Sequence, residues 1–319
     1  MSVQELAKKI QQETEKIIIG KSEKIRLVIM AVLAEGHVLL NDLPGVGKTT
    51  LVKTVSKALG CDHGRIQFVP DMLPSDIIGM RIFNQKTGDF ELKKGPVMTN
   101  ILLADEINRA IPRTQSALLE AMEERQISID TESYKLPEPF VVLATQNPVE
   151  MESTFKLPAA QMDRFLIQIS MGYPSPEEER EMLHRLGDEI PFDKVESVTN
   201  SEQILKARGE VNNVHVSDAV ADYIIAVCNA TRNHSQLMMG ASPRAARALY
   251  KAVKAWAAMD GRDYAVPDDV KALAHCVLDH RLVVENSARF SGVREADILE
   301  EILNRVPGAP APEELVNEG

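Results

Sequence analysis

The sequence has few cysteines and no long apolar run, and both shortages restrict what the protein can be. Its three cysteines, Cys61, Cys228 and Cys276, lie far apart and are odd in number, which fits neither a disulfide framework nor a CxxC metal site. No apolar run reaches the roughly 18 residues that a membrane-spanning helix needs, and residues 1–10 lack the apolar stretch of a signal peptide. We therefore expect reduced thiols, no membrane span and a cytoplasmic protein.

The chain also lacks an excess of positive charge. It contains 36 Lys and Arg against 47 Asp and Glu, a formal net charge of −11. Such a molecule as a whole repels phosphate backbones and anionic lipid surfaces, so a nucleic acid is a disfavoured partner. The proportions of apolar (44%) and charged (26%) residues are those of a folded globular protein, and 319 residues favour two domains.

The first half of the chain alternates short apolar runs with segments long enough to form helices. The runs, each bounded by turn residues, are 38–40, 66–69, 101–104, 141–144 and 166–169. This alternation predicts an α/β domain, residues 1–173, in which helices cover both faces of a parallel sheet.

Two polar segments interrupt this pattern. Residues 126–136 (QISIDTESYKL) alternate apolar and polar side chains around a polar break, which predicts an inserted hairpin. Residues 81–94 (RIFNQKTGDFELKK) contain the turn sequence Thr87-Gly88-Asp89 and predict a second insertion.

After residue 173 the strand signals end and helical periods take over. Helical patterns cover 177–186, 217–232, 243–259, 267–278 and 293–304. We predict a smaller all-helical domain over residues 174–306. The Pro-rich, acidic end, residues 307–319, is predicted to be a flexible tail.

A phosphate-binding loop is the strongest local signal. Residues 41–50 (NDLPGVGKTT) follow a predicted strand and precede a helical run, the context in which a P-loop binds nucleotide. Backbone N–H groups at the start of the helix can hold phosphates, Lys48 can reach the β and γ oxygens, and Thr49 can bind Mg²⁺. Asp42 stands where the strict motif has glycine. The predicted ATP-binding residues here are Gly45, Val46, Gly47, Lys48, Thr49 and Thr50.

Polar side chains also follow two other predicted strands. Asp105 and Glu106 come directly after the run 101–104, and Asn147 follows the run 141–144. Because ligands bind at the carboxyl ends of parallel strands, Asp105 is a candidate Mg²⁺ ligand, Glu106 a candidate to polarise the attacking water, and Asn147 a candidate to orient it. The alternatives are a strand that ends in solvated acids and an ordinary Asn-Pro turn.

With these residues in order, the sequence resembles the MoxR branch of the AAA+ ATPases. The resemblance spans residues 17–245 and rests on seven segments, IIIGKSE (17–23), LPGVGKTT (43–50), LLADEINRA (102–110), QSALLEAMEERQ (115–126), ATQNPVE (144–150), LPAAQMDRF (157–165) and GASPRA (240–245). It implies a P-loop AAA+ domain followed by a helical lid, with ATP bound between them and between neighbouring subunits of a homo-oligomeric ring, usually a hexamer.

The resemblance also implies roles for further residues. Ile19 and Gly20 would line the adenine site, Asn147 would be the first sensor, and Arg244 the second sensor, reaching the γ-phosphate from the lid. Arg164, in MDRF, matches the arginine finger supplied to the next subunit. Without the motif, Arg164 would be interpreted as a salt-bridged surface arginine.

The two insertions fall where the related magnesium chelatases and MCM helicases carry extra hairpins, which face the centre of the ring. Phe90, Lys93 and Lys94 are therefore candidate contacts for a client protein, although a solvated charged turn is the alternative. The resemblance implies an ATP- and Mg²⁺-dependent ATPase that remodels or matures a client, with a partner bearing a von Willebrand factor A domain. A nucleotide-controlled binding scaffold remains an alternative, and so does a DNA motor, which the acidic charge opposes.

Overall fold

The computed structural model describes residues 1–42, 45–147, 154–186 and 190–307. Its centre is a five-stranded sheet in the order β2-β5-β8-β1-β9, in which every neighbouring pair is parallel. The strands are β1 (Val38–Asn41), β2 (His63–Gln67), β5 (Ile101–Asp105), β8 (Val141–Gln146) and β9 (Ile167–Ile169). The parallel α/β sheet predicted from the apolar runs is confirmed, with β2 beginning three residues earlier than its run.

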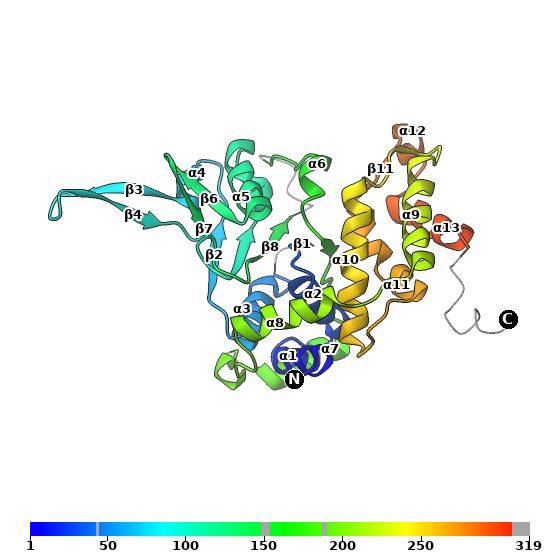
Figure 1. Cartoon of the computed structure of the whole chain (residues 1–319), viewed down its shortest axis with the longest axis horizontal. Helices are drawn as coiled ribbons and strands as arrows, with labels where there is room; N and C mark the ends of the chain where they lie inside the picture. Colours follow the sequence, from blue (N-terminus) through cyan, green and yellow to red (C-terminus); the bar gives the residue numbers. More distant parts are fainter. Residues whose placement is uncertain (43–44, 148–153, 187–189, 308–319) are drawn as a thin grey trace.

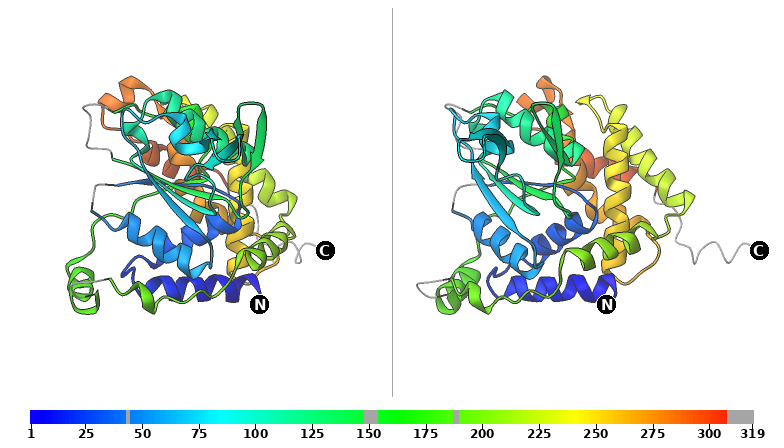
Figure 2. Two further views of the ribbon diagram at one scale, coloured as in Figure 1. Left: turned by 90° about the vertical axis from the view of Figure 1, so that its left-hand side faces the viewer. Right: turned by 60° about the vertical axis from the view of Figure 1, so that its left-hand side comes forward.

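Helices bury both faces of this sheet. Because alternate side chains of each strand point to opposite faces, each strand contributes to two apolar cores. Leu39, Leu102 and Val142 belong to the apolar core shared with α4 (Pro74–Ile78) and α5 (Pro112–Glu124). Leu40, Ile101 and Leu143 belong to the core shared with the helices of the other side, α1 (Val3–Glu15), α2 (Ser22–Leu33) and α3 (Lys48–Ala58). Figure 2 shows the two groups of helices on opposite sides of the sheet.

Both predicted insertions are antiparallel hairpins. One pairs β3 (Gly79–Asn84) with β4 (Asp89–Lys94), and the other pairs β6 (Gln126–Ile129) with β7 (Glu132–Lys135). The β3–β4 hairpin projects far from the body of the molecule (Figure 1). Phe83 and Phe90 face each other across it with ring centroids 5.4 Å apart, and both are more than half exposed.

The remainder of the described chain is mainly helical. Its helices are α6 (Ala159–Met162), α7 (Pro176–Leu186), α8 (Ser201–Asn212), α9 (Asp218–Arg232), α10 (Pro243–Met259), α11 (Pro267–Leu278), α12 (Asn286–Phe290) and α13 (Glu295–Arg305). Short 3-10 helices lie at η1 (Ile107–Arg109), η2 (Phe192–Lys194) and η3 (Asp279–Arg281), and a short antiparallel pair is formed by β10 (Leu237–Met239) and β11 (Val283–Val284). Among the described residues no helix is long and apolar enough to cross a bilayer.

The helical region packs directly on the α/β region. Buried residues of α1, α2, α8 and α10 form one apolar cluster that continues into the sheet. The N-terminal helix α1 contributes Leu6 and Ile10, both almost fully buried, to this cluster. The domain boundary predicted after residue 173 falls between β9 and α7, and most of the predicted tail lies outside the described residues.

Candidate functional site

The predicted phosphate loop leaves the carboxyl end of β1 and enters α3. Gly45 and Gly47 both adopt the left-handed conformation, with φ of 85° and 82°, and a side-chain carbon added to either would meet open space. Lys48 begins α3 and is buried, and its Nζ donates to the Asp42 carbonyl oxygen at 3.0 Å. Thr49 and Thr50 follow in the first turn of α3. Since glycine at the N-cap has no side chain to cap this turn, its N–H groups can bind a phosphate.

Asp42, the departure from the strict motif, has a structural task. Its carboxylate is buried and accepts hydrogen bonds from Ser170 Oγ (2.6 Å), Met171 N (2.8 Å) and Gly172 N (3.1 Å). The start of the phosphate loop is therefore tied to the segment that follows β9. Charge-assisted bonds of this kind are stronger than neutral ones, so Asp42 holds the loop where a glycine could not.

The segment that follows β9 also contacts Lys21, the residue next to the predicted adenine residues. Tyr173 accepts a hydrogen bond at its carbonyl oxygen from Lys21 Nζ (3.1 Å), and Lys21 Nζ lies 3.4 Å from a carboxylate oxygen of Glu178. Ile19, which is buried, and Gly20 directly precede Lys21. Lys21, the residue after Ile19 and Gly20, thus contacts the same segment that hydrogen-bonds to the Asp42 carboxylate.

The two predicted acids lie at the carboxyl end of β5 and share a hydroxyl group. Thr145 Oγ1 donates to Asp105 Oδ1 (2.7 Å) and accepts from the Glu106 backbone N–H (2.8 Å). The second oxygen of Asp105 binds Arg65 Nη2 at 2.8 Å. Glu106 has a positive φ of 56°, an uncommon conformation for a residue with a side chain, and the Thr145 bond helps to hold it. The hydroxyl of Thr49 and the carboxylate of Asp105 are oxygen donors of the kind that Mg²⁺ takes.

The side chain of Glu106 has two partners that sequence reasoning missed. Its Oε2 accepts a hydrogen bond from Gln67 Nε2 (2.7 Å) and lies 3.2 Å from Arg109 Nη1. Asn147, at the carboxyl end of β8, is buried, and its carbonyl oxygen accepts from Asn108 Nδ2 at 3.3 Å. The residues directly after Asn147 lie outside the described part of the chain.

The structure therefore brings Lys48, Asp105, Glu106 and Asn147 to one edge of the sheet, because they follow the neighbouring strands β1, β5 and β8. Thr145, Arg65, Gln67 and Arg109 complete this cluster. The signal that could have found Thr145 is its position, directly after the apolar run 141–144 and two residues before Asn147.

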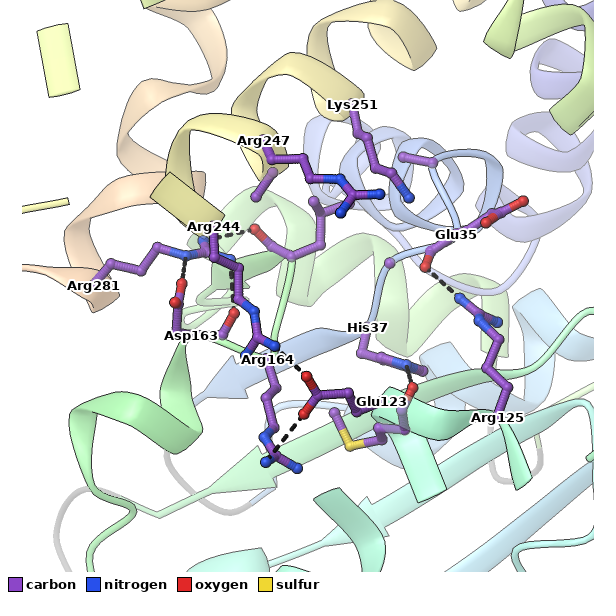
Figure 3. A pocket seen from close by; sticks show the side chains of 15 residues that line it. Glu35, His37, Glu123, Arg125, Asp163, Arg164, Arg244, Arg247, Lys251 and Arg281 are labelled. Atoms are coloured by element: carbon purple, nitrogen blue, oxygen red, sulfur yellow. Dashed lines mark hydrogen bonds and ion pairs between the residues drawn. The ribbon is translucent and has the colours of Figure 1, made fainter. Parts of the chain in front are cut away.

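Arg164 and Arg244 lie at the opposite edge. They line a cavity of about 290 Å³ together with residues that directly precede β1, Glu35 and His37 among them. Arg164 itself lies just before β9, and Arg244 lies in the first turn of α10 (Figure 3). The four residues of β1 span about 13 Å at roughly 3.3 Å per residue. The sheet thus stands between Arg244 and Lys48 of the same chain, and the structure does not bring Arg244 to the phosphate loop as the resemblance implied.

An ion pair between the buried Arg281 and the partly buried Asp163 holds the helical region against this edge. Arg281 Nε binds Asp163 Oδ1 at 2.6 Å, and Arg281 Nη1 donates to the Leu166 carbonyl oxygen at 3.0 Å. Ser242, the N-cap of α10, donates from its hydroxyl to the other oxygen of Asp163 (2.9 Å). Burial lowers the pKa of Arg281, and the Asp163 carboxylate opposes that shift. Asp163 thus fixes the start of α10, and with it Arg244, next to Arg164.

His37 is a buried neutral group beside this cavity. Its Nδ1 accepts from the Val142 backbone N–H (3.0 Å), so Nε2 carries the proton and donates to the Met122 carbonyl oxygen (3.1 Å). Burial lowers the pKa of His37 to about 3. Below about pH 6.5 His37 binds a proton in the unfolded chain but stays neutral in the folded chain. The free energy of unfolding should therefore fall as pH falls from 6.5 toward 3.

We expect His37→Asn to be less stable than the parent at pH 7.5 but to lose less stability on acidification. Between pH 6.5 and 5.0 the parent should lose about 2 kcal/mol more than the variant, at about 1.4 kcal/mol per pH unit. Urea unfolding at both pH values measures this difference. The exposed His184, changed to Gln, is the matched control and should behave like the parent. The same pH dependence of stability in His37→Asn and the parent would contradict the buried, neutral state of His37.

The fold and the site together define a class of protein. A phosphate loop after β1, paired acids after β5, a polar residue after β8 and a packed helical region are the parts of an AAA ATPase. The family described as "ATPase family associated with various cellular activities (AAA)" matches residues 37–167, and the AAA lid domain matches residues 229–302.

Comparisons that cover most of the chain identify the family more specifically. The chain is 42% identical to Chaperone MoxR1 of Mycobacterium tuberculosis, over 92% of this chain and 80% of the relative. It is 31% identical to Protein MoxR of Paracoccus denitrificans, over 88% of each chain. A solved structure from Cytophaga hutchinsonii superposes with a TM-score of 0.91 at 40% identity, covering 97% of this chain and 96% of that one. The chain belongs to the MoxR family of AAA+ ATPases.

Proposed function

We propose that the protein hydrolyses ATP to ADP and phosphate at a site that two copies build together. The carboxyl edge of one copy, with Lys48, Glu106 and Asn147, would bind the nucleotide, and the amino edge of the next copy would supply Arg164 and Arg244. The observation that carries this proposal is the separation of these two groups by the sheet of a single chain. A head-to-tail contact that repeats this pairing closes into a ring, for which the family suggests six copies.

Each residue at the carboxyl edge has a task that its chemistry supports. The first turn of α3 and Lys48 would hold the β and γ phosphates. Mg²⁺, held by Thr49 and Asp105, would offset the phosphate charge. Glu106, once released from Gln67 and Arg109, would accept a proton from the attacking water, and Asn147 would orient that water. Ile19 and Gly20 would border the adenine.

Arg164 and Arg244 would act on charge that grows in the transition state. A guanidinium group presents a planar set of donors that matches phosphate oxygens, and an arginine supplied in trans is worth roughly 10³ to 10⁵ in rate. In this proposal Arg244 is still a sensor of the γ-phosphate, but of the neighbour's nucleotide.

A composite site has a direct test in its dependence on concentration. We expect ATP turnover per subunit to fall steeply on dilution, because monomers hold no complete site. Turnover and sedimentation measured over the same concentration range should change together. Turnover per subunit that stays constant while the protein becomes monomeric would contradict the composite site.

Hydrolysis would drive the remodelling or maturation of a client protein in the cytoplasm, with a von Willebrand factor A domain partner. The printed name of the M. tuberculosis relative, a chaperone, supports this part of the proposal. The exposed Phe83 and Phe90 of the projecting β3–β4 hairpin also support it, since exposed apolar groups mark contact surfaces. Lys93 and Lys94 lie in the same hairpin.

A further inference from the structure

A single carboxylate joins the two arginines of the amino edge. Glu123 Oε2 lies 3.1 Å from Arg164 Nη2, and Glu123 Oε1 accepts a hydrogen bond from Arg244 Nη2. Figure 3 shows the carboxylate between the two guanidinium groups. Two cations this close repel each other, and the shared anion offsets that repulsion. Each guanidinium has five N–H donors and gives one to Glu123, so donors of both remain for a phosphate.

The backbone around Glu123 is held in place. Glu123 lies in the last turn of α5, whose Met122 carbonyl oxygen accepts from His37 Nε2 at 3.1 Å. Arg125, just after the helix, donates to the carbonyl oxygens of Glu35 (2.7 Å) and Phe140 (3.2 Å). These contacts tie the end of α5 to the chain on both sides of Glu123. The backbone that carries the Glu123 carboxylate is therefore fixed, so this side chain can position other groups.

The two arginines depend on Glu123 to different degrees. Arg164 has a second anchor on the same helix, because its Nη1 donates to the Leu119 carbonyl oxygen at 2.7 Å. The Arg244 side chain is 48% exposed, and among the described residues Glu123 is the acid that it pairs with. Arg244 should therefore lose more than Arg164 from removal of this partner, since in the described part of the chain no second acid pairs with its half-exposed guanidinium.

We infer that Glu123 is a positioning residue. It holds the guanidinium groups of Arg164 and Arg244 side by side, where both can bind the phosphates of the neighbouring subunit's ATP. This inference rests on the proposed function. Glu123 itself would not touch the nucleotide. Its role would be to keep Arg244 oriented before the subunits meet, so that less ordering remains for the transition state.

The test is Glu123→Gln, with Glu124→Gln as a matched control that removes the same charge one residue later. Glu124 is exposed, and the ion pairs of Arg164 and Arg244 among the described residues are with Glu123. We expect Glu123→Gln to lower kcat by about tenfold or more with little change in KM, and Glu124→Gln to retain parental kinetics. The second readout is Glu123→Gln in an Arg244→Ala background, where the additional loss should be less than about threefold because Arg244 is already absent.

The outcomes separate this inference from the proposed function. Arg164→Ala and Arg244→Ala variants with a strongly lowered but measurable kcat, beside a Glu123→Gln variant with parental or raised kcat, would overturn the inference and leave the composite site standing. An additive loss in the double variant would also overturn it, since a general structural effect does not depend on Arg244. Full activity in both arginine variants would overturn the composite site itself.

Discussion

Lys48→Ala should lose ATP binding, whereas Glu106→Gln should still bind ATP and Mg²⁺ but barely hydrolyse the ATP. Lys48 is buried at the start of α3, where its charge would meet the phosphates in the bound state. Removing one partner of such a desolvated charge pair costs about 2 to 5 kcal/mol, which raises the Kd about 30-fold or more. Glu106 acts on the water in the transition state, so its loss should lower kcat by about 10² to 10⁴. Calorimetric titration with ATP and a turnover assay measure the two effects separately.

Lys53→Ala is the matched control for Lys48→Ala, because Lys53 is an exposed lysine on the same helix. It should bind and hydrolyse ATP as the parent does. An equal loss of nucleotide affinity in Lys48→Ala and Glu106→Gln would show that this division of roles between the two residues is wrong.

Mixing Lys48→Ala protein with Arg164→Ala protein should restore turnover that neither protein has alone. Arg164→Ala is expected to bind ATP almost normally and to hydrolyse it about 10³- to 10⁵-fold more slowly. In a mixed ring, an intact phosphate site of one subunit meets an intact Arg164 of its neighbour at about a quarter of the interfaces, given equal amounts and random order. Turnover should rise to roughly that fraction of the parental value. Subunit exchange is followed in parallel with two fluorescent labels.

A mixture of Lys48→Ala with Glu106→Gln is the control for this experiment. Both changes damage the carboxyl edge, so no interface in the mixture holds a complete site and turnover should not recover. If the first mixture is as inactive as the second while exchange is demonstrated, Arg164 does not act on the neighbouring subunit.

The sequence predicted the carboxyl edge because its signals are local. Asp105 comes directly after a short apolar run, and Lys48 and Asn147 follow two other such runs within a few residues; the carboxyl ends of parallel strands meet at one edge of the sheet. The strands and both hairpins followed from alternation and turn residues over a few positions. Sequence reasoning missed two partners: Thr145 contacts Asp105 across a separation of 40 residues, and Gln67 contacts Glu106 across a separation of 39. No local pattern specifies contacts of that range.

The class of fold, the phosphate loop and the order of the polar residues along the strands could all be predicted from the sequence, since these depend on spacing and residue type. The edge of the sheet at which Arg164 and Arg244 lie depends instead on tertiary packing. Arg244 is separated from Glu123 by 121 residues. Their contact depends on how α10 docks, which the Asp163–Arg281 ion pair and the Ser242 cap help to set. Packing of whole helices sets that arrangement, and the free energy of packing is spread over many apolar contacts that no short motif records.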